Sequence, residues 1–374
     1  MADEFLLGVN YWPARKFVRM WSEFDAGEIA RDFSTIRGLG LRLVRFFLFW
    51  PDFQPQPDVI DKRQLDNLAT VFDLATRRGL LLMPTLLVGH MSGPNWMPAW
   101  AMSDEPNNRP RVYAVDGVVS PHKPRDIFGG DARVFAAERL LVRTVVERFR
   151  THAALWGWDV CNEIDIVQLP ETAAGERWLR TIVDDIHALD HAHPVTAGLV
   201  GWPDAIARGF HREAHRLVDV ASVHSYPLYD ATAAGPGDTA YVGRMIEETR
   251  ARAGVPVMLA EFGMSINPEP GTRSVTMTWG GYEQTVALVD EREAGQFVRD
   301  VLPVARDAGA TGALIWCFSD YMPEMYGDLP FADLIHERYF GIYAADGRLK
   351  ATGEAMREFA RVLQPGDRRG ATFS

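Results

Sequence analysis

Short apolar runs alternate along the chain with longer segments in which apolar residues recur at helical spacing. Most of the short runs are almost continuously apolar, as parallel strands covered on both faces should be. The alternation predicts repeated strand–helix units, eight strands with eight helices. The expected strands cover residues 6–10, 43–49, 80–88, 155–162, 195–200, 220–225, 257–261 and 313–318.

The segments between the runs carry signals for where helices begin and end. Asp25 with Glu28 forms a capping-box pattern, and Ile29 and Phe33 then begin an apolar face. Gly40, like the glycines that close three later segments, marks a helix end shortly before the next strand. These signals agree with the alternation.

The pattern predicts a single (β/α)8 barrel of the TIM type over residues 1–365, with 366–374 as a loose C-terminal tail. Long connections follow the third, seventh and eighth strands, at 91–130, 263–289 and 319–339. Loops at the C-terminal ends of barrel strands build active sites. We therefore expect these three connections to wall a pocket.

Composition narrows the possible partners. The chain has 374 residues, and 50 acidic against 39 basic side chains give a net charge of −11 without a basic stripe, so nucleic acid is not favoured. No apolar run approaches the roughly 18 residues that cross a bilayer, and Asp3 and Glu4 do not fit a secretory signal. Cys161 and Cys317 lie in apolar runs, which favours buried free thiols and a cytoplasmic location.

The strongest chemical signal is the segment 156–163, Trp-Gly-Trp-Asp-Val-Cys-Asn-Glu. An apolar strand ends there in an amide and a carboxylate, so Glu163 is expected to project into the pocket and Asn162 to hold a sugar hydroxyl. The alternative is that Glu163 merely caps the following helix.

A second carboxylate ends the segment 257–263, Val-Met-Leu-Ala-Glu-Phe-Gly. Glu261 and Glu163 end the seventh and fourth strands, which face each other across the mouth of a closed barrel. Two opposed carboxyl groups are what glycoside hydrolysis requires, and retaining enzymes hold them about 5 to 5.5 Å apart.

With these residues in place, the sequence resembles the clan A glycoside hydrolases, and more narrowly family 5, over almost its whole length. The resemblance rests on eight positions at successive strand ends. They are Arg45, His90, Asn162, Glu163, His224, Tyr226, Glu261 and Trp316. Family 5 usually has proline after the Asn-Glu pair, but this chain has Ile164, which weakens assignment to a subfamily.

The resemblance implies hydrolysis of β-glycosides with retention, with Glu163 as acid/base and Glu261 as nucleophile. Glu163 must then be protonated when substrate arrives. We expect the neighbouring carboxylate to raise the pKa of Glu163, and Arg45 and Tyr226 to keep Glu261 ionised.

Rings near the strand ends are candidate sugar contacts. His224 and Tyr226 alternate along the sixth strand and so point to one side, and Trp316 offers a flat face to a sugar ring. Packing in the core is the alternative for each ring. Looser candidates in or near the same loops are Trp12, Trp50, Trp96 and Trp279.

Cofactors are not expected. No Gly-x-Gly-x-x-Gly or Walker motif occurs, and the segment 89–93 has Met91 where a nucleophile elbow needs serine. We hypothesise an exo-acting β-mannosidase that works on short β-linked oligosaccharides. The alternatives are an endo-β-mannanase or β-glucanase with an open groove, and a non-catalytic carbohydrate-binding barrel.

Overall fold

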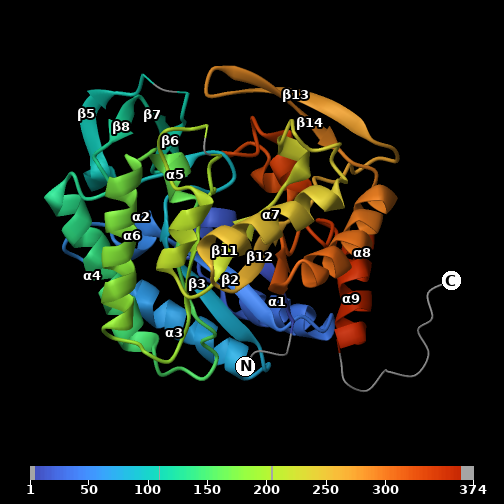
Figure 1. Cartoon of the computed structure of the whole chain (residues 1–374), viewed down its shortest axis with the longest axis horizontal. Coiled ribbons are helices and arrows are strands. Elements are labelled where there is room, and N and C mark those ends of the chain that lie inside the picture. Colours follow the sequence, from blue (N-terminus) through green and yellow to red (C-terminus); the bar gives the residue numbers. More distant parts are fainter. Residues whose placement is uncertain (1–4, 109, 204, 364–374) are drawn as a thin grey trace.

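The computed structural model describes residues 5–108, 110–203 and 205–363, and its centre is a parallel eight-stranded sheet (Figure 1). The strand order is β10-β9-β3-β2-β1-β15-β12-β11, and the amide of Val220 donates to the oxygen of Val195 between the two ends. The sheet therefore closes into the expected barrel. Its strands are β1 (Leu6–Tyr11), β2 (Leu43–Phe49), β3 (Leu81–Val88), β9 (Trp158–Asn162), β10 (Val195–Gly198), β11 (Ala221–His224), β12 (Val257–Phe262) and β15 (Ala310–Ile315).

Helices surround the barrel, but the prediction of eight full helices is wrong for the fifth unit. Among the described residues between β10 and β11, the one helical element is the short 3-10 helix η3 (Arg212–Leu217), because Gly201, Pro203 and Gly209 interrupt this connection. The other units have α1 (Ala26–Gly38), α3 (Lys62–Thr76), α4 (Ala132–Phe149), α6 (Thr172–His187), α7 (Thr239–Ala253), α8 (Glu291–Asp307) and α9 (Ala351–Leu363).

Local signals placed most strand boundaries to within one residue. The side chain of Asp25 accepts hydrogen bonds from the amides of Gly27 and Glu28, which confirms the predicted start of α1. The fourth strand begins at Trp158 rather than at residue 155, since Leu155 meets β3 only through one isolated bridge. The last strand runs three residues earlier than predicted, so Trp316 follows it directly.

The barrel interior is apolar at one end and polar at the other. Side chains of Leu43, Met83 and Leu314, with Val220 and Met258, form a buried cluster at the N-terminal ends of the strands. Arg45 lies two residues along β2 from Leu43, on the same face, and is fully buried above that cluster. The polar groups of the site begin at this level.

The three long connections all lie over the C-terminal ends of the strands (Figure 1). In its described residues, the first contains five short strands and one 3-10 helix, the second a hairpin, and the third two 3-10 helices. They comprise β4 (Asn95–Trp96), η2 (Ala99–Ala101), β5 (Met102–Pro106), β6 (Tyr113–Val115), β7 (Val118–Ser120) and β8 (His122–Pro124); β13 (Arg273–Trp279) and β14 (Tyr282–Leu288); and η5 (Pro323–Met325) and η6 (Ile335–Tyr339).

The β13–β14 hairpin (residues 273–288) contacts the other two connections. We call this hairpin, which links them, the loop bridge. At the hairpin turn, a Cβ on Gly280 would lie 2.5 Å from the oxygen of Pro110 in the connection after β3. A Cβ on Gly93 would lie 2.3 Å from Leu334 and 3.4 Å from Trp279. The connections after β3, β12 and β15 therefore touch one another above the barrel.

One sequence expectation falls on residues beyond this description, and another can be checked only within it. The predicted tail at 366–374 lies outside the described residues, so the division at residue 365 stays a prediction. Across the ranges that the structure does describe, no helix combines the length and apolar character that crossing a membrane requires.

Candidate active site

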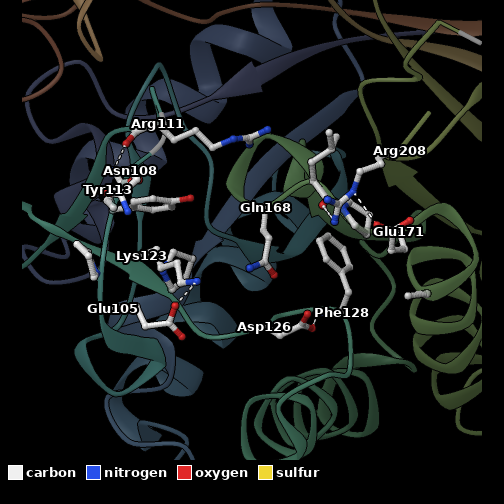
Figure 2. Close-up of a pocket in the computed structure, with 16 residues that line it drawn as sticks. Glu105, Asn108, Arg111, Tyr113, Lys123, Asp126, Phe128, Gln168, Glu171 and Arg208 are labelled. Atoms are coloured by element: carbon white, nitrogen blue, oxygen red, sulfur yellow. Dashed lines mark hydrogen bonds and ion pairs between the residues drawn. The ribbon is translucent and has the colours of Figure 1, made fainter. Parts of the chain in front are cut away.

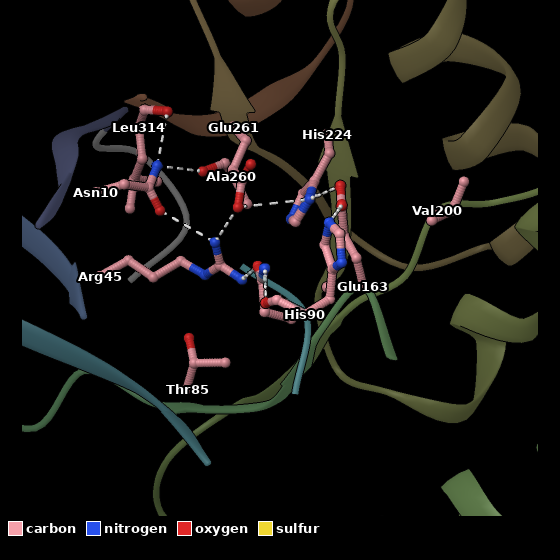
Figure 3. A network of polar contacts seen from close by, with 12 residues as sticks. Asn10, Arg45, Thr85, His90, Glu163, Val200, His224, Ala260, Glu261 and Leu314 are labelled. Atoms are coloured by element: carbon pink, nitrogen blue, oxygen red, sulfur yellow. Dashed lines mark hydrogen bonds and ion pairs between the residues drawn. The ribbon is translucent and has the colours of Figure 1, made fainter. Parts of the chain in front are cut away.

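Arg45 is the centre of a buried polar network at the barrel mouth (Figure 3). Its Nη1 atom donates to Oε1 of Glu261 at 2.5 Å, and its Nε donates to Oδ2 of Asp159 at 2.8 Å. A fully buried guanidinium between two carboxylates is electrically compensated, and these charges hold the pKa of Arg45 above its ordinary value although burial opposes this.

Two members of this network were missed in the sequence. Asn10 on β1 accepts from Arg45 at 3.0 Å and donates to the backbone oxygen of Ala260, and Asp159 on β9 also accepts from Thr85. Asp159 offered a signal, because a carboxylate inside an otherwise apolar strand needs a buried partner. Nothing local distinguished Asn10.

Glu261 is held on both oxygens. Besides Arg45 on Oε1, the hydroxyl of Tyr226 donates to Oε2 at 2.8 Å. The Glu261 side chain is only 6% exposed. These donors fix the direction in which the carboxylate faces the mouth.

Glu163 is placed by an unusual backbone. It has φ 43° and ψ 43°, a left-handed conformation that is uncommon for a residue with a Cβ. It precedes the short helix α5 (Ile164–Val167) but its side chain makes no capping hydrogen bond, so the capping alternative is wrong. The side chain turns instead toward the mouth and is 18% exposed.

Two histidines contact Glu163. His224 Nδ1 lies 2.9 Å from Oε1, and His90 Nε2 lies 3.6 Å from Oε2. His90 is oriented by Asn95, whose Oδ1 lies 3.0 Å from His90 Nδ1. Both rings therefore lie beside Glu163, and their predicted contact with a sugar stays a prediction.

The expected rise in the pKa of Glu163 is not found. Burial acts to raise this pKa, but the hydrogen bond and charge of His224, with nearby His90 and Arg45, lower it below its ordinary value. Burial lowers the pKa of His224, whereas Glu261 and the hydrogen bond to Glu163 raise it overall. The pair therefore favours a proton on His224 and a charged Glu163.

The two glutamates face each other at short range. One carboxylate oxygen of each and a nitrogen of His224 all lie within 4.8 Å of one another. These three side chains also have the donor types of a metal site. The Arg45 guanidinium beside Glu261 would repel a cation. The geometry therefore favours two carboxylates that are each held by hydrogen bonds from neighbouring side chains over a metal site.

Asn162 is largely occupied by protein partners. Its Oδ1 accepts from Arg45 Nη2 at 2.8 Å, and its Nδ2 donates to the backbone oxygen of His90 at 3.0 Å. An amide nitrogen carries two hydrogens, so one N–H is left for a sugar hydroxyl. The predicted contact of Asn162 with a sugar therefore stays a prediction, limited to this one N–H group.

The tryptophans separate into two groups. Trp12 and Trp50 are each 1% exposed, and Trp12 stacks on Phe47 with ring centroids 5.3 Å apart. Neither has a free face, so the predicted sugar contacts do not fit these two residues. Trp316 packs edge-on against Phe47, with 6% of its surface exposed at the end of β15.

Two loop tryptophans lie at the edges of the mouth. Trp96 is mostly buried and donates from Nε1 to the oxygen of Met91, which holds the connection after β3 together. Trp279 is half-buried and belongs to the loop bridge, where it approaches Gly93. Both fit a structural role, and Trp279 also keeps part of its surface open.

A separate polar cavity of 350 Å³ lies beside α5 (Figure 2). Neither glutamate lines it. Its charged side chains are largely paired, with Lys123 2.5 Å from Glu105 and Arg208 3.1 Å from Glu171. This cavity is therefore distinct from the carboxylate pair.

Similar solved structures are enzymes of the expected kind. A subfamily 18 member of glycoside hydrolase family 5 from Streptomyces cattleya, in complex with GlcNAc, is 23% identical with a TM-score of 0.79, covering 98% of this chain and 82% of that one. The exo-beta-1,4-mannosidase from Opitutaceae bacterium strain TAV5 is 27% identical with a TM-score of 0.74, covering 96% of this chain and 60% of that one.

A more distant similarity is to the endo-1,4-beta-D-mannanase of Thermotoga petrophila RKU-1. It is 17% identical with a TM-score of 0.65, covering 96% of this chain and 99% of that one. No protein-family model matches the chain, and no curated protein matches it. The chain therefore shares its fold with solved glycoside hydrolases of family 5, and it brings two carboxylates together at the barrel mouth.

Proposed function

We propose that the chain is a retaining β-glycosidase in which Glu261 is the nucleophile and Glu163 the acid/base, and that it acts as an exo-β-mannosidase. The observation that carries this proposal is the approach of the two carboxylates to within 4.8 Å at the ends of β12 and β9. That spacing suits the short carboxyl separation of retaining enzymes and is below the roughly 6.5 to 9.5 Å of inverting ones.

The contacts suggest how the two steps proceed. Glu261, oriented by Arg45 and Tyr226, attacks the anomeric carbon while the glycosidic oxygen takes a proton from Glu163. The proton reaches Glu163 from His224 over their 2.9 Å hydrogen bond. In the second step Glu163 removes a proton from water, which attacks the anomeric carbon and releases Glu261.

Mannose is proposed as the sugar because of the structural relatives. Their names include an exo-beta-1,4-mannosidase and a family 5 enzyme bound to Manβ1-4GlcNAc, although the chain spans only 60% of the former. Short oligosaccharides with a terminal β-mannose are therefore the proposed substrates. A cytoplasmic location is proposed as well, since Cys161 and Cys317 are buried free thiols.

Exo action is supported by the position of the loop bridge. The leaving group must lie on the Glu163 side, over β9, β10 and β11, because Glu163 protonates the departing oxygen. The strands between β12 and β3 on the other side are β15, β1 and β2, and the bridge joins the connections that flank them. The hairpin also packs against Leu228 beyond β11, so the bridge narrows the mouth as a whole, which favours a pocket over an open groove.

The second candidate is an endo-β-mannanase, or less closely a β-glucanase. It is favoured by the likeness to the Thermotoga endo-mannanase, 99% of whose chain is covered. This alternative requires the polysaccharide substrate to extend past the loop bridge. A non-catalytic sugar-binding barrel explains the rings but not the opposed carboxylates.

The test is a time course on aryl β-mannoside, glucoside, galactoside and xyloside, and on mannobiose to mannopentaose. We expect the mannosides to be preferred and mannose to be released one unit at a time. Early fragments of intermediate size would show endo action. Faster hydrolysis of another aryl glycoside would show that mannose is not the preferred sugar. The anomer of the first product, followed by NMR, should be β.

A further inference from the structure

An exposed aromatic ring, that of Tyr229, lies close to the catalytic residues but takes no part in their contacts. Tyr229 ends the short 3-10 helix η4 (Pro227–Tyr229), immediately after β11, and is 47% exposed. Large aromatic side chains are usually mostly buried, so an exposed ring beside a catalytic site needs an explanation.

Tyr229 is nevertheless held firmly. Its ring lies 5.8 Å from the ring of Tyr226, which binds Glu261, and 5.8 Å edge-on from His336. The preceding residue, Leu228, packs against the apolar cluster of the hairpin, and Pro227 fixes the first turn of η4. An exposed ring held by its neighbours is preorganised for a ligand.

The ring also lies on the side of the acid/base. Burial first, then the charges of Glu337 and Glu163, raise the pKa of the Tyr229 hydroxyl above its ordinary value. Tyr229 also follows β11, whose last residue, His224, lies 2.9 Å from Glu163, and part of the ring is exposed. On the proposed mechanism the departing sugar occupies this side.

We propose that Tyr229 is the platform for the first sugar of the leaving group, with the open face of its ring stacked on the apolar face of that pyranose. This inference rests on the proposed function, since it takes Glu163 as the acid. It makes Tyr229 a determinant of which aglycones are accepted, and assigns no part of the bond cleavage to it.

The experiment compares two substrates that share a glycone but differ in the leaving group. One is the β-linked disaccharide that the substrate panel identifies, and the other is the matching β-glycosyl fluoride, whose leaving group has no ring to stack. Tyr229→Ala should lower kcat/KM for the disaccharide about tenfold and change that for the fluoride by less than about twofold.

Two further variants sharpen the comparison. Tyr229→Phe keeps the ring and should retain most disaccharide activity, whereas Arg208→Ala, in the separate polar cavity, should leave both substrates unaffected. The proposal is overturned if Tyr229→Ala affects both substrates equally or neither, or if the disaccharide-specific loss follows Arg208→Ala instead. If the wild-type protein hydrolyses neither substrate, the proposed function itself fails.

Discussion

The two glutamates are held by different kinds of partner. Glu261 is 6% exposed, and its two hydrogen-bond donors are a guanidinium and a phenol, while His224 Nδ1 lies farther away, 3.5 Å from Oε1. Glu163 is 18% exposed, and its partners are two imidazoles, the nearer being His224, whose pKa Glu261 and the hydrogen bond to Glu163 raise although burial opposes this. A nucleophile needs one orientation and one charge, whereas an acid/base must change its protonation during each cycle.

Removing the nucleophile is expected to have the largest effect. Glu261→Ala should lower kcat/KM on an aryl β-glycoside by on the order of 10⁵-fold, because no other described group is placed to attack the anomeric carbon. The matched control is Glu269→Ala, an exposed glutamate in the same connection. Activity above a tenth of wild type in Glu261→Ala would remove this residue from the mechanism.

Removing the acid/base should lower activity less than removing the nucleophile, and the loss should depend on the leaving group. We expect Glu163→Ala to lose roughly 10² to 10⁴-fold, with the smaller loss for aryl leaving groups that need little protonation. Added azide should restore turnover and yield a β-glycosyl azide. An equal loss for every leaving group, with no azide rescue, would contradict the assignment.

The partners of the two glutamates should differ in how much they contribute to the free energy of unfolding. Arg45→Met leaves Asp159 and Glu261 buried without their cation, so the free energy of unfolding should fall by about 3 to 5 kcal/mol. Beside Glu163, His90→Asn should cost only about 1 kcal/mol. Urea unfolding measures both, and a similar loss for the two variants would show that the two glutamates are equally anchored.

We expect Asp165, two residues after Glu163, to make the free energy of unfolding depend on pH. Burial raises its pKa to about 7, well above the ordinary value, so the stability that its protonated form contributes is lost as pH rises from about 4 through 7. Asp165→Asn removes this loss. Relative to wild type it should gain on the order of 2 to 4 kcal/mol between pH 4 and pH 8, measured by urea unfolding at both. A constant difference would contradict the prediction.

Much of the fold was predictable because its signals are local. The bounds of β2 were predicted to the residue, and Asp25 caps α1 as its spacing indicates. The missing fifth helix shows the limit of counting units, because a connection can be short without changing the strand order. The hairpin β13–β14 was expected only as a long connection, since its packing partners lie elsewhere in the chain.

The sequence by itself determined that two carboxylates end buried strands, at Glu163 and Glu261, because strand periodicity and strand ends are properties of neighbouring residues. Only the tertiary structure decided which side chains surround them. Asn10 reaches Arg45 and Trp12 is buried against Phe47 through contacts between different strands and loops, and the proton shared by His224 and Glu163 depends on charges that meet only in the closed barrel.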